Sequence, residues 1–243
     1  MMKLRALVTR PRHEAATLAA LLAERRVDAV IEPMIEIVDR PASLPGLDGV
    51  QAILCTSANG ARALARASGE RTIRLFAVGD ATARAARAAG FVAVESADGD
   101  VEDLARLAAA RLRPADGRLL HVAGSEAAGD LAGRVGAAGF AVGRAVLYEA
   151  RAAGALSPAA AELIGRGKID LALFFSPRSA AIFARLATAA GVADGLAVTR
   201  AVAISAAADA ALADLPFCAH IVAAAPTQAA LLARVDAFAG QTA

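Results

Sequence analysis

The sequence is poor in aromatic residues and in cysteine, and these shortages exclude several classes of protein. Its 243 residues include no tryptophan, one tyrosine and two cysteines. A nucleic-acid-binding protein is not expected, because aromatic platforms for stacking bases and a run of basic residues are both missing. Cys55 and Cys218 lie far apart without C-x-x-C spacing, which argues against a disulfide framework or a zinc site.

Long apolar runs are missing as well. Apolar residues make up 57% of the chain and charged residues 21%, which is the composition of a folded globular protein. The longest apolar runs are far shorter than the ~20 residues of a membrane span, and the N-terminus lacks the apolar region of about 7–15 residues that a signal peptide contains. We therefore expect a cytoplasmic protein that does not contact a membrane.

Motifs for metals, nucleotides and nucleophilic catalysis are also absent. The three histidines stand singly, without acidic or cysteine partners at ligand spacing, so no metal site is expected. The sequence contains neither a P-loop nor a strand that leads into G-x-G-x-x-G, which argues against a nucleotide cofactor. The turns at Ser57 and Ser176 lack the flanking glycines of a hydrolase nucleophile elbow. No cofactor is expected.

Short apolar runs alternate along the chain with Ala/Leu/Arg-rich segments of helical period. Nine predicted strands, the first at Ala6–Thr9 and the last at His220–Ala223, alternate with nine predicted helices. The helices include Glu14–Arg25, Ala58–Ala67 and Pro158–Gly165. This pattern is typical of an α/β fold with doubly wound parallel sheets of the flavodoxin or Rossmann kind. A chain of this length has room for two small domains, each with its own core.

An internal repeat supports two lobes of one topology. The segment Ala52–Ala61 is similar to Leu171–Ala180, and two further similar pairs follow in the same order. Two extended stretches, Met34–Arg40 and Arg144–Arg151, fall outside the alternation and carry apolar residues beside charges at period two. We interpret them as paired linker strands, a two-stranded β-ladder that joins the lobes.

Polar turns follow several of the predicted strands. In doubly wound sheets, ligands bind beyond the carboxyl ends of the strands, where helix N-termini present free N–H groups to anions. Turns facing each other across a cleft would therefore hold a polyanion; they are Thr9–Arg12, Thr56–Gly60, Gly79–Thr82, Gly124–Glu126, Ser176–Ser179 and Pro226–Gln228. The alternative is that the hydroxyl groups only cap helices. That reading applies to Thr56, Ser57, Ser176, Ser179 and Thr227.

Tyr148 is the only tyrosine and lies in one of the proposed linker strands. A phenol that faces the cleft could donate a proton, since it stays protonated at neutral pH. The alternative is an ordinary half-buried strand aromatic.

Taken together, the motifs resemble the uroporphyrinogen-III synthase family over essentially the whole chain. The ordered set is Val8–Pro11, Thr56–Gly60, Ala77–Gly79 with Thr82–Ala83, Tyr148, Phe175–Ala180 and Pro226–Thr227. The resemblance implies two α/β lobes, the first discontinuous. The implied ranges are 1–36 with 149–243 for one lobe, 37–148 for the other, and linker strands at about 34–40 and 144–151.

The resemblance also implies a reaction. The substrate would be hydroxymethylbilane, a linear tetrapyrrole with eight carboxylates, and the enzyme a cyclising carbon–oxygen lyase that forms uroporphyrinogen III for tetrapyrrole biosynthesis. Loss of the hydroxyl group gives an azafulvene, which the substituted carbon of ring D attacks through a spiro intermediate, so that this ring is inverted. No metal or organic cofactor is implied, and the protein's task is chiefly to fold the substrate. We expect a monomer that docks transiently with the preceding pathway enzyme.

Specific residues carry over from the family motifs. Tyr148 matches the tyrosine proposed to assist departure of the hydroxyl group. Substrate contacts are implied at Arg10, Thr56, Ser57, Asn59, Gly79, Thr82, Ser176, Arg178, Ser179 and Thr227. This chain departs from the family at Ile204–Ala208, where a Gly and a Thr are common, so no contact is carried over to Ser205.

Two other classes of function use the same kind of lobes. One is a noncatalytic bilobal receptor or receiver-like signalling module, and the other is an inactive relative of the synthases. A periplasmic receptor would carry an export signal. A receiver would carry clustered acids after its first strand, where this chain has Arg10, Pro11 and Arg12.

Overall fold

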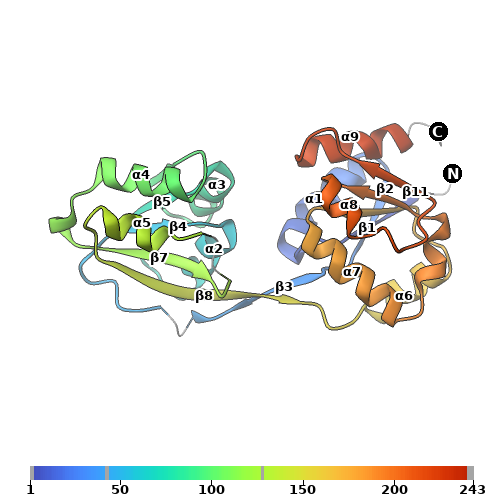
Figure 1. The fold of residues 1–243 in the computed structure, drawn as a ribbon, viewed down its shortest axis with the longest axis horizontal. Helices are drawn as coiled ribbons and strands as arrows, with labels where there is room; N and C mark the ends of the chain where they lie inside the picture. The colour runs from blue at the N-terminus through green and yellow to red at the C-terminus, as the bar shows by residue number, and fades with distance from the viewer. Residues whose placement is uncertain (1–2, 42–43, 127–128, 240–243) are drawn as a thin grey trace. The chain divides into compact units, whose positions relative to one another are not determined.

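The computed structural model describes residues 3–41, 44–126 and 129–239. The chain divides into two compact units, which we call unit 1 (Met1–Glu36 with Arg151–Ala243) and unit 2 (Ile37–Ala150). Figure 1 shows both, each with a sheet between helices. Of the lobe ranges inferred from the sequence, residues 1–2, 42–43, 127–128 and 240–243 lie outside the described residues.

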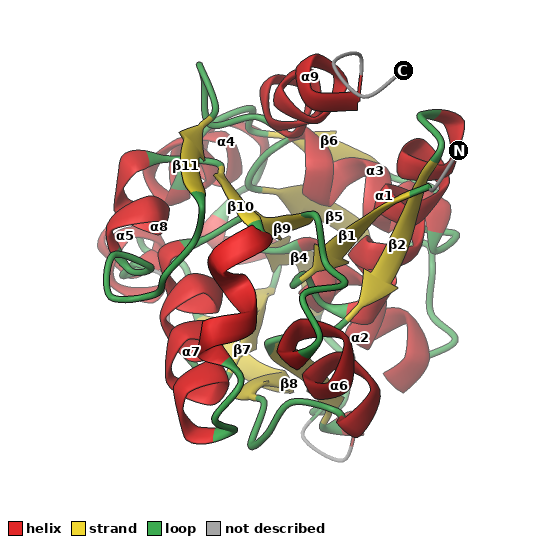
Figure 2. Cartoon of the chain, turned by 90° about the vertical axis from the view of Figure 1, so that its right-hand side faces the viewer, coloured by secondary structure: helices red, strands yellow, loops and turns green. Residues whose placement is uncertain are grey.

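Unit 1 is built on a five-stranded parallel sheet with the order β11-β10-β9-β1-β2. Figure 2 shows these strands in that order from left to right. The strands are β1 (Leu4–Val8), β2 (Val27–Ile31), β9 (Leu171–Phe174), β10 (Arg200–Ala203) and β11 (Ala219–Val222). The helices are α1 (Arg12–Glu24), α6 (Pro158–Gly165), α7 (Pro177–Ala189), α8 (Ala206–Ala210) and α9 (Gln228–Ala239).

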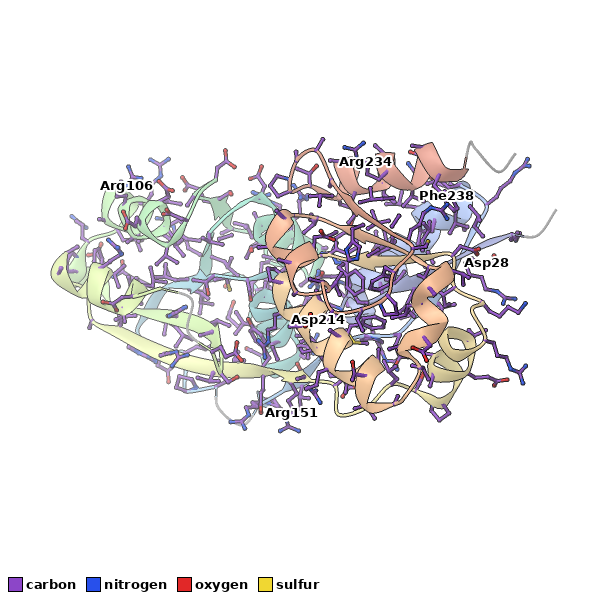
Figure 3. The ribbon with its side chains drawn as sticks, turned by 45° about the vertical axis from the view of Figure 1, so that its right-hand side comes forward. Asp28, Arg106, Arg151, Asp214, Arg234 and Phe238 are labelled. Atoms are coloured by element: carbon purple, nitrogen blue, oxygen red, sulfur yellow. The ribbon has the colours of Figure 1, made fainter. Side chains whose placement is uncertain are left out.

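Both faces of the unit 1 sheet are buried, which explains why its strands are apolar throughout rather than alternating with polar residues. Successive side chains point to opposite faces of a strand. Ala6 and Val8 accordingly pack with α1 and α9, whereas Leu7 packs with α6 and α7. On the face that α9 covers, the guanidinium of Arg200, at the start of β10, lies 4.1 Å from the ring centre of Phe238, which Figure 3 labels.

Unit 2 is built on a six-stranded sheet with the order β3-β8-β7-β4-β5-β6, in which β3 begins and β8 ends two residues outside the unit. Its elements are β3 (Ile35–Asp39), β4 (Val50–Cys55), α2 (Ala58–Ala67), β5 (Arg74–Ala77), α3 (Asp80–Ala88), β6 (Val94–Ser96), α4 (Val101–Arg111), β7 (Arg118–Gly124), α5 (Leu131–Ala137) and β8 (Val142–Ala152). Helices α2 and α3 cover one face, and α4 and α5 cover the other.

Strand β3 runs antiparallel to β8, whereas strands β4 to β8 pair in parallel. The amide of Arg40 donates to the carbonyl of Leu147 at 2.7 Å, and the amide of Ala153 donates to the carbonyl of Met34 at 2.9 Å. One residue number rises along this pair as the other falls, which is the antiparallel pattern. The two stretches interpreted as linker strands therefore belong to neighbouring strands of a sheet.

The predicted α/β class with parallel sheets is confirmed. The strand orders of the two units are also related. In unit 1 the run β9-β10-β11 lies beside β1-β2, and in unit 2 the run β4-β5-β6 lies beside β7-β8 in the same spatial order. The chain enters the two arrangements at different strands, so they are related by circular permutation. Two short 3₁₀ helices, Pro114–Asp116 and Ala193–Val198, were not predicted. Within the described residues, no helix is both long and apolar enough to span a membrane.

Phe174 forms the centre of the unit 1 core on the α7 side. It is fully buried, and its ring centre lies 5.2 Å from that of Phe183 and 6.2 Å from that of Phe217. We expect Phe174→Ala to lower the free energy of unfolding by about 3–5 kcal/mol, because it removes buried apolar area and leaves a cavity. Val92→Ala, at a side chain that is 76% exposed, is the control and should change it by less than about 0.5 kcal/mol. Urea unfolding followed by circular dichroism measures both, and equal effects would contradict this account of the core.

Candidate active site

Each sheet has a point at which the chain order reverses, and ligands of doubly wound folds bind at the carboxyl ends of the strands there. In unit 2 this point lies between β4 and β7, and in unit 1 it lies between β1 and β9. The turn after β4 carries Thr56 and Ser57, and β7 ends at Gly124. The predicted polar turns therefore occupy the expected edges.

A change of register between β7 and β8 places the only tyrosine at this edge of unit 2. Ala123 pairs with Val146, but the next residue, Gly124, pairs with Tyr148, so that Leu147 is an extra residue. Such a bulge interrupts the alternation of side chains along a strand. Leu147 and Tyr148 consequently both pack against the apolar cluster beneath α2.

The phenol of Tyr148 lies at the beginning of α2. Its oxygen is 2.8 Å from Oγ of Ser57, and this Oγ also accepts a hydrogen bond of 3.0 Å from the amide of Gly60. Ser57 is thus the N-cap of α2 as well as the partner of Tyr148. Unpaired amides and the helix dipole give this end a partial positive charge, which favours an anionic ligand group.

His121 lies close to the same turn, on β7. Its Nε2 is 3.4 Å from Oγ1 of Thr56, and the side chain is buried. Burial, together with the positive charge of the Arg144 guanidinium, lowers the pKa of His121 to about 4. The imidazole is therefore neutral at physiological pH, and it acts as a hydrogen-bonding group rather than as a cation.

The other sequence-predicted residues of unit 2 lie around the first turns of α2 and α3. Oδ1 of Asn59 accepts a hydrogen bond of 3.1 Å from Arg62. Gly79 is the N-cap of α3, and its carbonyl accepts from the amide of Thr82 at 3.0 Å. Because Thr82 is only 5% exposed, this turn offers a ligand its backbone rather than the threonine hydroxyl.

In unit 1, Arg10 links its own turn to Gln228 of another predicted turn and to Phe175, which directly precedes a third. Its guanidinium lies 4.5 Å from the ring centre of Phe175, which follows β9. Nη1 donates to Oε1 of Gln228 at 2.8 Å, and Nε donates to Glu14 at 2.7 Å. The neighbouring Thr9 is buried and donates to the carbonyl of Leu173 at 2.7 Å. Arg10 therefore shares its charge with a carboxylate from the first turn of α1.

Two of the hydroxyl groups predicted in unit 1, those of Ser176 and Thr227, accept hydrogen bonds from amides in the first turns of helices. Oγ of Ser176 accepts from the amide of Ser179 at 3.1 Å and is 2.8 Å from Oγ of Ser179, which is buried. Thr227 accepts from the amide of Ala230 at 3.2 Å. Arg178 is exposed in the first turn of α7. Ser205, to which no contact was carried over, caps α8.

Comparison with known proteins assigns the chain to a family. The family model described as uroporphyrinogen-III synthase HemD matches residues 16–233. The chain belongs to the uroporphyrinogen-III synthase family. The resemblance stated from the sequence motifs is thereby confirmed. A search of curated proteins gave no match.

Solved uroporphyrinogen-III synthases share the fold. The structure of the enzyme from Helicobacter pylori matches with a TM-score of 0.63 at 15% identity, covering 98% of this chain and 100% of that one. A mutant enzyme from the extremely thermophilic bacterium Thermus thermophilus matches with a TM-score of 0.50 at 17% identity, covering 99% of this chain and 100% of that one.

The sequence analysis placed Gly124 in a polar turn but did not predict that it meets Tyr148, and it did not predict His121 or Arg144 near this turn. His121 is a polar residue inside the apolar strand β7, and that contrast was a usable signal. The importance of Gly124 and Arg144 depends on the pairing of β7 with β8, which no local pattern reveals. Among residues 3–41, 44–126 and 129–239, no cluster of three His, Cys, Asp or Glu side chains is suited to a metal.

The lowered pKa of His121 predicts a pH dependence of stability. Between the ordinary value of about 6.5 and the folded value of about 4, the unfolded chain binds a proton at this side chain that the folded protein does not. Falling pH therefore destabilises the fold in this window, by up to about 3 kcal/mol from this group. We expect His121→Gln to lose that much less unfolding free energy than the original protein between pH 6.5 and pH 4 in urea titrations. Equal losses in the two proteins would contradict the burial of a neutral imidazole.

Proposed function

We propose that this chain is a uroporphyrinogen-III synthase, a carbon–oxygen lyase that converts hydroxymethylbilane into uroporphyrinogen III and water. The observation that carries this proposal is the family match over residues 16–233. The geometry around Tyr148 supports it, because a phenol stands at the strand edge where a ligand of this fold is expected, beside a helix N-terminus suited to carboxylates.

In the proposed first step, Tyr148 assists the departure of the substrate hydroxyl group. The lone pair of the pyrrole nitrogen expels this group, and the phenol donates the proton with which it leaves as water. The azafulvene that results is attacked by the substituted carbon of ring D, which forms the spiro intermediate. Fragmentation and reclosure at the other carbon then invert the ring, and the proton released on closure balances the one donated.

Ser57 suits the direction of that proton transfer. If Tyr148 donates to the substrate, its oxygen is free to accept a hydrogen bond from the hydroxyl of Ser57. Oγ of Ser57 meanwhile accepts from the amide of Gly60 at 3.0 Å, which leaves its own proton for Tyr148 at 2.8 Å. The chain amide–Ser57–Tyr148 would stabilise negative charge that develops on the phenol oxygen.

The carboxylates of the substrate require donors, and each unit offers some. We infer contacts at Thr56, Ser57, Asn59, Gly79 and Thr82 in unit 2, and at Arg10, Ser176, Arg178, Ser179 and Thr227 in unit 1. The capping hydroxyls do not exclude this role, since a helix N-terminus has several amides and one cap satisfies only part of them. Holding the chain of four pyrroles in one conformation is the main requirement, because the activated pyrrole closes without inversion when unguided.

No cofactor is needed in this proposal, since the leaving hydroxyl and the electron-rich pyrrole supply the driving force. We further infer that the enzyme acts as a monomer. Transient docking with the enzyme that makes hydroxymethylbilane would limit loss of an unstable substrate.

The identity of the product tests the proposed function. Purified protein is mixed with freshly generated hydroxymethylbilane, the products are oxidised, and the type I and type III uroporphyrin isomers are separated by chromatography. We expect type III to accumulate. Formation of type I alone, at the rate seen without protein, would refute the synthase and favour a noncatalytic binding module.

Tyr148→Phe tests the role of the phenol. Removal of one general acid typically costs about 10²-fold, and we expect a loss of about that size in the rate of type III formation. The aromatic ring remains, so the circular dichroism spectrum and the urea midpoint serve as controls for folding. Turnover equal to that of the unsubstituted protein would remove Tyr148 from the mechanism.

A further inference from the structure

The ring of Tyr148 occupies the space in which a side chain at residue 124 would stand. A Cβ atom built on Gly124 would lie 2.7 Å from Cζ, 2.9 Å from Cε2 and 3.0 Å from the phenol oxygen of Tyr148. Carbon atoms that are not bonded pack at about 3.5–4.0 Å. Even the smallest side chain at this position would therefore collide with the end of the tyrosine that carries the hydroxyl group.

Hydrogen bonds hold the backbone on both sides of Gly124, so a small backbone shift at this residue does not relieve the collision. The ring of Tyr148 has to move instead. The carbonyl of Gly124 accepts a hydrogen bond of 2.9 Å from Nη2 of Arg144. The amide of Ser125 donates to the carbonyl of Tyr148 at 3.0 Å, next to the bulge that pairs Gly124 with Tyr148. Gly124 itself does not have a positive φ, so its backbone conformation is open to alanine. The tyrosine is what requires a glycine here.

We propose that Gly124 is a positioning residue for Tyr148. Because Gly124 has no side chain, the tyrosine ring fits between Gly124 and Ser57, in a position that we call the seat. This inference rests on the proposed function, because it assigns Gly124 a part in the same reaction. The bulge in β8 turns the tyrosine toward α2, the bare Cα of Gly124 admits its ring, and Ser57 binds its oxygen at 2.8 Å. A side chain at residue 124 displaces the phenol from Ser57 and from the reacting hydroxyl group.

Gly124→Ala tests the seat, and Gly143→Ala is its matched control. Both glycines lie in the paired strands β7 and β8. The nearest atom to a Cβ atom at Gly143 is the flexible end of the Arg118 side chain at 3.3 Å, and the next two contacts, at 3.8 and 4.0 Å, are at ordinary packing distance. We expect Gly124→Ala to lower kcat for type III formation by up to about 10²-fold, the effect of losing the general acid, with little change in KM. The kcat of Gly143→Ala should stay within about twofold of that of the unsubstituted protein, a much smaller change than the loss of a general acid causes.

A double substitution separates positioning from general damage to the fold. If Gly124 acts through Tyr148, Gly124→Ala should cause no further loss of kcat in a Tyr148→Ala background, where the ring that collides is gone. Losses that multiply, as for two independent sites, would overturn the proposal.

A spectroscopic readout makes the inference independent of activity. Since Tyr148 is the only tyrosine, incorporation of fluorotyrosine gives one fluorine NMR resonance from this seat. The resonance should move in Gly124→Ala and stay in place in Gly143→Ala. Absence of type III product from the unsubstituted protein would refute the proposed function, while the NMR comparison would still decide the seat. An unmoved resonance in a folded Gly124→Ala variant would overturn the inference.

Discussion

Strands β7 and β8 pair in register as far as Ala123 and Val146 and then slip by one residue, so that Gly124 faces Tyr148. Regular alternation would bury Leu147 beneath α2 and turn Tyr148 toward the face that α4 and α5 cover. The slip keeps both on the α2 side, where the phenol reaches Ser57. The proposed chemistry of unit 2 thus depends on a single extra residue in a strand pair, together with a glycine that leaves room for the ring.

Electrostatics at the strand edges suits a ligand with many carboxylates. Helices α2 and α7 begin there with a serine cap, and each presents amides and the positive end of its dipole. Arg10 is already paired with Glu14 and stacks on Phe175. It therefore adds little unbalanced positive charge to this edge. Neutral His121 adds no charge beside Thr56. Backbone amides are therefore the main donors that these turns offer.

Much of the fold could be predicted because buried parallel strands are continuous apolar runs, and α2 and α6 were predicted with the observed limits. Helix α1 was predicted to start at Glu14 but starts at Arg12, because the carbonyl of Pro11 accepts the amides of Glu14 and Ala15. The identity of Tyr148 as a candidate followed from its rarity. The contact of Gly124 with Tyr148 could not be predicted, because it depends on the bulged pairing of β7 with β8. His121 stood out as a polar residue in an apolar strand, but its approach to Thr56 depends on the pairing of β4 with β7.

We infer that a tetrapyrrole binds at the carboxyl ends of β4 and β7, around Ser57 and Tyr148. Hydrogen exchange with and without uroporphyrinogen III, read by mass spectrometry, measures this most directly. We expect slower exchange in the peptides that carry Ser57 and the end of β8 at Tyr148. Protection confined to the opposite edge of the sheet, where Gln51, Arg74 and Arg113 line a cavity of about 510 Å³, would contradict it.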